Sequence, residues 1–295
     1  MPANSKSTAS KQASRSATTN QSHITLVLRM ISPGDGEQVR DKLKAVMPDM
    51  YRAADEMGTI HYFRVFELDV RRFVLLAEYD GDLDTALADF AKYFGPSFDA
   101  VMPHVVDAPP TPVADNVEAF VKWAKSNCIR PITSYEAVPA TVKEIKALAA
   151  NAGITLDSNP GPHRPLLIIM PMRSGLTTAA AKLTVSLARP LIFKGADAVG
   201  TVHFSHLAEF SSSELGFFTI YDGRFVDYIH DFARKLGPAF DLLFKFVVDP
   251  VPTPVAKYTD TFVKWSNNHD WCSIGFYNAY PGLSVQDVKA LLANE

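Results

Sequence analysis

Hydrophobic positions along the chain change their spacing in a fixed order. A short apolar run predicts a strand over 24–31, and apolar positions with helical spacing follow over 35–56. Two more strands are expected, one that begins at Thr59 and one over 72–79, and helical spacing returns from Leu83. The first part of the pattern is therefore strand, helix, strand, strand, helix.

The rest of the pattern adds two helices and a strand. The helix already begun is expected to end at Gly95-Pro96, because glycine adopts the left-handed cap and proline cannot continue the helical hydrogen bonds. A helix around 117–125, a strand near 132–137 and a last helix over 142–151 follow. This order is typical of a ferredoxin-like βαββαβ unit of the α+β class with extra helices. Its antiparallel sheet carries helices on one face and leaves the other face in need of a partner.

The whole pattern occurs twice, at a constant offset of 142 residues. The segment from Gly58 to Trp123 returns without an insertion as the segment from Gly200 to Trp265. A period of this length is far beyond that of a solenoid repeat, so it indicates a duplicated domain. Two linked copies can close their open sheet faces on each other within one chain.

The two repeats are predicted to cover residues 23–151 and 165–295, with a proline-containing linker over 152–164. Residues 1–22 are rich in Ser and Thr and hold three basic and no acidic residues. They lack the apolar segment of a secretory signal, so we expect a disordered tail there, with an organellar transit peptide as the alternative.

The first long helix differs between the repeats. Pro48 aligns with Pro190, and each proline is expected to kink or break its helix. The helical apolar spacing is less regular in the second repeat, where Arg189 stands opposite Met47.

Composition limits the partners that the chain can have. It is 47% hydrophobic and 21% charged over 295 residues, which is ordinary for a globular protein. The net charge of −3 gives no general attraction to nucleic acid or anionic membrane. The longest apolar run, 166–170, is far shorter than the ~20 residues of a membrane span. Cys128 and Cys272 are expected to be buried free thiols, and we expect a cytoplasmic protein that is a monomer or a homo-oligomer.

The duplicated element order resembles the dimeric α/β-barrel superfamily in its fused, tandem form. That superfamily includes chlorite dismutases, dye-decolourising peroxidases, haem-degrading and quinone-forming monooxygenases, and muconolactone isomerases. The resemblance implies two antiparallel sheets packed as a pseudo-dimeric barrel, with haem or an aromatic metabolite between them. The Gly-x-x-Asp-Gly signature of dye-decolourising peroxidases is absent, because residues 78–81 are Glu-Tyr-Asp-Gly without the leading glycine.

The candidate catalytic residues come from the second strand of each repeat. Strand alternation places His61 and Glu67 on one face, and His203 and Glu209 on the equivalent face of the copy. The other face is more apolar in the second repeat, so it is expected to lie under the helices. The His/Glu face would then point into the inter-sheet space, where imidazole can ligate haem or transfer protons. The alternative is that each histidine only satisfies a structural hydrogen-bond partner.

Candidate cofactor-binding residues are His203, His230, Tyr79 and Tyr221. The two tyrosines occupy equivalent positions on the neighbouring strands, whereas His230 aligns with Ala88 and breaks the symmetry. An exposed position without a ligand is the alternative for His230. Haem is a possible cofactor, but the residues alone leave the cofactor unknown.

Two further patterns favour structural roles. Asp80 and Asp222 each lie between a strand and a helix, so they are interpreted as N-caps of that helix. No metal site is predicted, because His203 and His206 are three residues apart on a strand and so point to opposite faces.

Two functions remain open from the sequence. The first is a barrel protein that binds haem or a hydrophobic aromatic small molecule between its sheets, with a peroxidase-like or monooxygenase-like oxidoreductase role. The second is a non-catalytic ligand-binding or protein-interaction module. No phosphate-binding loop, nucleophile elbow or dinucleotide fingerprint is present, so nucleotide-dependent chemistry has no support.

Overall fold

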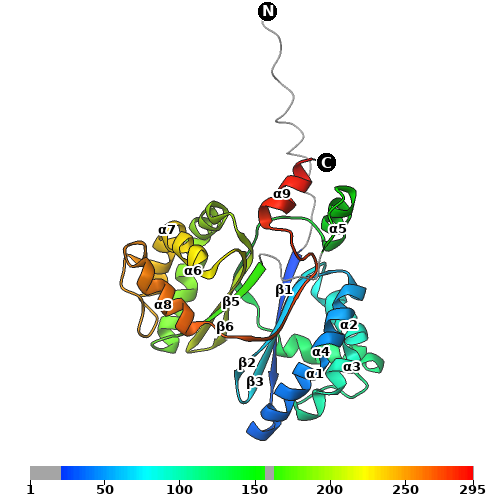
Figure 1. The fold of residues 1–295 in the computed structure, drawn as a ribbon. Coiled ribbons are helices and arrows are strands. Elements are labelled where there is room, and N and C mark those ends of the chain that lie inside the picture. The colour runs from blue at the N-terminus through cyan, green and yellow to red at the C-terminus, as the bar shows by residue number, and fades with distance from the viewer. Residues whose placement is uncertain (1–20, 157–162, 295) are drawn as a thin grey trace, which may run out of the picture.

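A computed structural model describes residues 21–156 and 163–294. They form two four-stranded antiparallel sheets that face each other, with helices on their outer sides (Figure 1). This is the predicted α+β architecture. The first sheet has the order β1 (Gln21–Arg29), β3 (Arg72–Asp80), β2 (Ile60–Asp69), β8 (Ser273–Asn278). The second has the order β4 (Pro131–Glu136), β6 (Val202–Ser211), β7 (Glu214–Asp222), β5 (His163–Pro171).

The helices follow the predicted order in both repeats. The first repeat contains α1 (Pro33–Met57), α2 (Leu83–Tyr93), α3 (Gly95–Asp99), α4 (Val117–Asn127) and α5 (Val142–Asn151). The second contains α6 (Gly175–Val199), α7 (Phe225–Leu243), α8 (Thr259–His269) and α9 (Val285–Ala293). Short 3₁₀ turns occupy Met102–His104, Val113–Asp115 and Val255–Lys257. None of the helices in the described part of the chain is long and apolar enough to cross a membrane.

Proline breaks fewer helices than the sequence predicts. Both α1 and α6 continue through Pro48 and Pro190 without a break. The Gly-Pro pair ends α2 in the first repeat, but in the second α7 runs on through Pro238. There the rings of Phe232 and Phe240 contact each other across the proline, 5.0 Å apart. Such packing offsets the single hydrogen bond that a proline removes.

Each repeat gives its last strand to the sheet of the other repeat. Strand β4 pairs with β6, and β8 pairs with β2. The chain then returns, so that α5 and α9 lie side by side at one end of the molecule (Figure 1). The exchange interlocks the repeats, and the sequence did not predict it.

The space between the sheets is filled in two different ways. Towards one end it is apolar, with Phe66 and Leu76 of the first sheet packed against Leu167 and Phe218 of the second. Towards the other end it contains a group of buried polar side chains, which are His61, Arg64, Glu78, His163, His203, His206 and Asp222. A polar inter-sheet region is therefore the first candidate for a functional site.

Three smaller expectations have mixed outcomes. Gln21 and Ser22 belong to β1, and His163 and Arg164 of the predicted linker belong to β5. Residues 1–20 of the predicted tail and 157–162 of the predicted linker lie outside the described residues. Cys128 and Cys272 are both free thiols, as expected. Cys272 is exposed, however, so its predicted burial is wrong.

Candidate functional site

The two strand-start histidines lie between the sheets because of β-bulges. The register of β2 against β3 shifts between Ile60 and Tyr62, and that of β6 against β7 shifts at the equivalent position. A bulge places an extra residue in the strand and re-aims its side chain. His61 and Tyr62 consequently both contact Tyr280, with ring centroids 5.8 and 5.4 Å from it.

Beyond the bulge, the side chains of each strand point to the opposite face of the sheet from the one expected. Glu67 lies on the helix side, where its carboxylate accepts from Arg40 of α1 at 2.5 and 2.6 Å. Glu209 forms the equivalent ion pair with Lys182 of α6. The expectation that both glutamates share the inter-sheet space with the histidines is wrong, because the bulge shifts the alternation by one residue.

Each of these histidines has partners at both ring nitrogens. His61 Nε2 lies 2.9 Å from Asp80 Oδ1, and its Nδ1 lies 3.0 Å from the Tyr280 hydroxyl. His203 has the equivalent carboxylate at 2.7 Å and the Tyr62 hydroxyl at 3.1 Å. Neither imidazole offers a free nitrogen to iron, so these residues do not fit the role of haem ligand that their strand position led us to expect.

The two aspartates tie these histidines to the helices that follow the exchanged strands. Asp80 Oδ2 accepts from the backbone N–H of Val142 at 2.8 Å, and Asp222 Oδ2 accepts from that of Val285 at 2.8 Å. The interpretation of Asp80 as the N-cap of the next helix is wrong, because Asp82 caps α2 instead. Each His–Asp pair therefore fixes the start of α5 or α9 against its sheet.

The other predicted cofactor-binding residues lie away from the inter-sheet space. Tyr221 stacks on Tyr228 of α7, with ring centroids 3.9 Å apart, and Tyr79 belongs to the core beneath the helices of the first repeat. Burial raises the pKa of Tyr79 and of Tyr221 to about 12. His230 is partly exposed and lies 3.2 Å from Asp260 of α8.

The helix layers of the two repeats are packed differently. In the first repeat Met47 of α1 lies so close to Gly275 of β8 that a Cβ there would be 2.0 Å from its sulfur. At the equivalent positions of the second repeat stand Arg189 and Thr133. Arg189 is exposed and its guanidinium packs over the ring of Phe193 at 4.9 Å, so among the described residues its side chain does not replace the methionine above Thr133.

A cavity of about 50 Å³ lies at this point, between the second sheet and helices α6 and α7. It is larger than the roughly 10–15 Å³ that one water occupies by the same measure. The side chains that line the cavity are smaller than their counterparts in the first repeat, since Val185 and Ala188 replace Leu43 and Val46. Its other apolar lining residues include Ile192, Phe193, Phe217, Phe232, Phe240 and Leu243.

One polar group in this cavity lacks a partner. The Thr133 hydroxyl is buried and makes no hydrogen bond, whereas Tyr135 donates its hydroxyl to Asp197 at 2.7 Å. His206 also contributes to the wall, but its ring points into the inter-sheet space, where its Nδ1 lies 3.7 Å from Glu78 Oε1. Burial lowers the pKa of His206, so the ring is neutral at neutral pH. None of the described lining residues therefore carries a full charge.

Sequence reasoning missed the inward-facing polar residues. Arg64 and His206 belong to no predicted site, because the faces of β2 and β6 are the reverse of those expected. Glu78 belongs to none because it lies on β3, whose faces the sequence leaves undetermined. The available signal was a charged or titratable residue at the same position of an otherwise apolar strand face in both repeats, Arg64 in one and His206 in the other.

No known protein family and no curated protein matches the chain. Solved structures similar to it include a proposed monooxygenase from Fusobacterium nucleatum, 9% identical over 90% of this chain and 96% of that chain, with a TM-score of 0.35. A proposed monooxygenase from Lactobacillus acidophilus is 9% identical over 88% and 97%, with a TM-score of 0.30. A haem-binding protein from Thermus thermophilus is 11% identical over 94% and 98%, with a TM-score of 0.24. Values this low carry no conclusion about ligand or reaction.

The fold itself is that of a dimeric α/β barrel in fused form. Two repeats of one chain each supply three strands to their own sheet and one strand to the other, and the sheets pack face to face.

Proposed function

We propose that the chain binds a small neutral molecule, with an apolar body and one hydrogen-bonding group, in the cavity under α6. The observation that carries this proposal is the exchange of Met47 and Gly275 for Arg189 and Thr133 between the repeats. The layer between sheet and helices is filled in the first repeat and contains a cavity in the second. The first repeat therefore serves as the reference against which the cavity of the second is recognised.

The chemistry of the lining supports this ligand class. Leucine, isoleucine and phenylalanine side chains favour an apolar body, and the unpaired Thr133 hydroxyl selects a group that can donate or accept a hydrogen bond. A charged ligand would lose its hydration without gaining a counter-charge. The site lies between sheet and helices, rather than between the sheets as the sequence led us to expect.

Binding, rather than turnover, is the proposed activity of this cavity. Among the described lining residues, the titratable side chain that faces the cavity is Tyr135, whose hydroxyl already donates to Asp197. Burial and Asp197 both raise the pKa of Tyr135, which keeps the phenol protonated. An oxidoreductase reaction would need a further group.

The test is ligand binding to the full chain with phenol, toluene and benzoate as probes, followed by NMR chemical shifts and thermal unfolding. Phenol is expected to bind best, toluene more weakly and benzoate least. The variant V185L/A188V/R189M, which carries the residues of the first repeat, is expected to lose phenol binding while remaining folded. Thr133→Val is expected to weaken phenol binding severalfold and to leave toluene binding unchanged, because only the hydrogen bond is removed.

The matched control is Leu187→Ala, which alters the exposed side of the same helix. It is expected to bind phenol like the parent chain. Equal phenol binding by the filled triple variant and the parent would refute the assignment of the cavity.

A further inference from the structure

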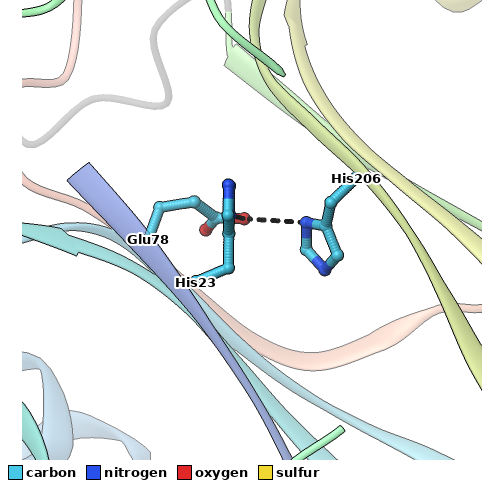
Figure 2. Close-up of side chains that lie close together, drawn as sticks. All are labelled: His23, Glu78 and His206. Atoms are coloured by element: carbon cyan, nitrogen blue, oxygen red, sulfur yellow. Dashed lines mark ion pairs between the residues drawn. The ribbon is translucent and has the colours of Figure 1, made fainter. Parts of the chain in front are cut away.

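A second group of side chains, separate from the cavity, has the composition of a metal site. His23 of β1 and Glu78 of β3 approach His206 of β6 across the inter-sheet space, and Figure 2 shows Glu78 and His206 directed toward each other. One ligand atom of each residue lies within 4.8 Å of the other two. We infer that these three residues bind a divalent transition metal ion.

The distances are close to those of a formed site. Glu78 Oε1 lies 3.8 Å from His23 Nδ1 and 3.7 Å from His206 Nδ1. Ligand atoms at about 2.0–2.1 Å around a tetrahedral ion are about 3.3 Å apart. Small side-chain rotations would therefore bring both nitrogens and the carboxylate onto one ion.

The burial of two unpaired histidine nitrogens supports the metal site independently of the distances. Nδ1 of His23 and Nδ1 of His206 are buried and have no hydrogen-bond partner, although such atoms in folded proteins almost always have one. The His206 side chain is fully buried, and its Nε2 lies 3.4 Å from Thr25 Oγ1. If Nε2 donates to Thr25, the lone pair of Nδ1 is left directed at Glu78, as in metal-binding histidines whose second nitrogen is held by a hydrogen bond.

The ion has a route to this site. A cavity of about 340 Å³ reaches His23, and its wall also includes Gln21, Glu136 and Asp197. The wall also contains the guanidinium of Arg189, so its two carboxylates leave a net negative charge, which favours entry of a cation. Two imidazoles and one carboxylate leave further coordination positions open, as in zinc enzymes and non-haem iron oxygenases.

The other triad in the described residues is a weaker candidate. His163, His203 and Asp222 also lie within 4.8 Å of one another. His163 Nε2 already donates to the Leu283 carbonyl at 2.7 Å, and its Nδ1 lies 2.6 Å from Asn278 Nδ2. Its nitrogens are committed, as are both nitrogens of His203.

The experiment is titration of the metal-free full chain with Co²⁺, followed by visible ligand-field absorption, and competition by Zn²⁺. One equivalent is expected to bind, and Zn²⁺ is expected to shift the ring ¹⁵N resonances of His23 and His206. The variants H23A, E78Q and H206A are each expected to weaken Co²⁺ binding at least about tenfold. H230A and E67Q are matched controls that keep the parent affinity.

Circular dichroism and thermal unfolding separate loss of ligand from loss of fold. E78Q is nearly isosteric, so it keeps the test interpretable where an alanine variant unfolds. The inference is overturned if the parent binds no Co²⁺, if folded E78Q binds it as tightly as the parent, or if Zn²⁺ moves only the resonances of other histidines. Because phenol binding is measured on different residues, these outcomes do not depend on the proposed function.

Discussion

Arg64 and His206 are counterparts at the 142-residue offset, and both pack against the ring of Phe218. The Arg64 guanidinium lies 5.5 Å from its centroid, and the His206 ring stacks on it at 4.5 Å. Duplication has thus brought two copies of one strand position together in the inter-sheet space. One copy supplies a cation and the other a neutral imidazole.

The first prediction concerns the Arg64 charge. Burial lowers the pKa of Arg64 to about 10, so it remains a cation at neutral pH, and one of its terminal nitrogens has no partner. A cation near Glu78 opposes a second cation, so Arg64→Met is expected to raise Co²⁺ affinity about three- to tenfold in the titration. The unfolding free energy is expected to change by less than about 1 kcal/mol, because a packed apolar side chain often replaces a buried charge without loss.

The control for this variant is Arg40→Met, which removes a cation on the helix side of the same strand, where it pairs with Glu67. Its Co²⁺ affinity is expected to equal that of the parent chain. Tighter binding in both variants would indicate a general charge effect and not a local one.

The second prediction compares the two helix layers. Met47→Ala removes a side chain that fills the first repeat, and it is expected to lower the unfolding free energy by about 3 kcal/mol. Arg189→Met adds an apolar side chain beside the cavity, in a rotamer different from that of Met47 because Thr133 has the Cβ that Gly275 lacks, and it is expected to raise the unfolding free energy by about 1 kcal/mol. Chemical denaturation of both variants measures this difference, and two changes of the same sign would contradict the comparison.

Element order and duplication were predictable because they depend on local patterns. The helices and strands predicted from apolar spacing, such as the helix after Asp82, are present in the structure. They form from local sequence and do not depend on which distant segments pack against them. The exchange of β4 and β8 was not predictable, since a strand has the same pattern in either sheet. The bulge after Ile60 carries no glycine or other local mark, yet it reversed the faces of Tyr62 and Glu67.

Hydrogen-bond partners that come from distant segments of the chain could not be predicted from the sequence either. Asp80 has the sequence position of a helix cap, but the partner of its carboxylate comes from a helix that begins 62 residues later. The metal-ligand candidates His23 and His206 come from different repeats and have no spacing signature. The irregularity at Arg189, by contrast, was visible in the sequence and marks the cavity.

The third prediction concerns the His–Asp pairs. Asp222→Ala removes the hydrogen bonds to His203 and to the backbone of Val285, both in buried surroundings. We expect a loss of about 3 kcal/mol in unfolding free energy, since buried hydrogen bonds to a carboxylate are among the stronger ones. Amide hydrogen exchange at the start of α9 is expected to accelerate more than exchange in α8. Asp227→Ala, on the exposed side of α7, is the control and is expected to change neither measurement.

The fourth prediction is a pH dependence of stability that arises at His163. Burial, followed by the nearby His203, lowers the pKa of His163 from 6.5 to about 4 in the folded chain. Between these two pH values the unfolded chain binds a proton that the folded chain does not bind, so stability falls as the pH falls through this window. The loss approaches about 3 kcal/mol near pH 4 and is absent above pH 7.

The first repeat supplies the matched variant for this measurement. Gln21 occupies the position equivalent to His163, and its Nε2 donates to the Ala140 carbonyl as His163 Nε2 donates to that of Leu283. His163→Gln is therefore expected to keep the hydrogen bond and to remove part of the pH dependence between 6.5 and 4. Urea denaturation of the parent and H163Q at pH 7.5 and pH 5 measures the difference. An unchanged pH dependence in H163Q would show that other groups, and not this imidazole, take up the proton on unfolding.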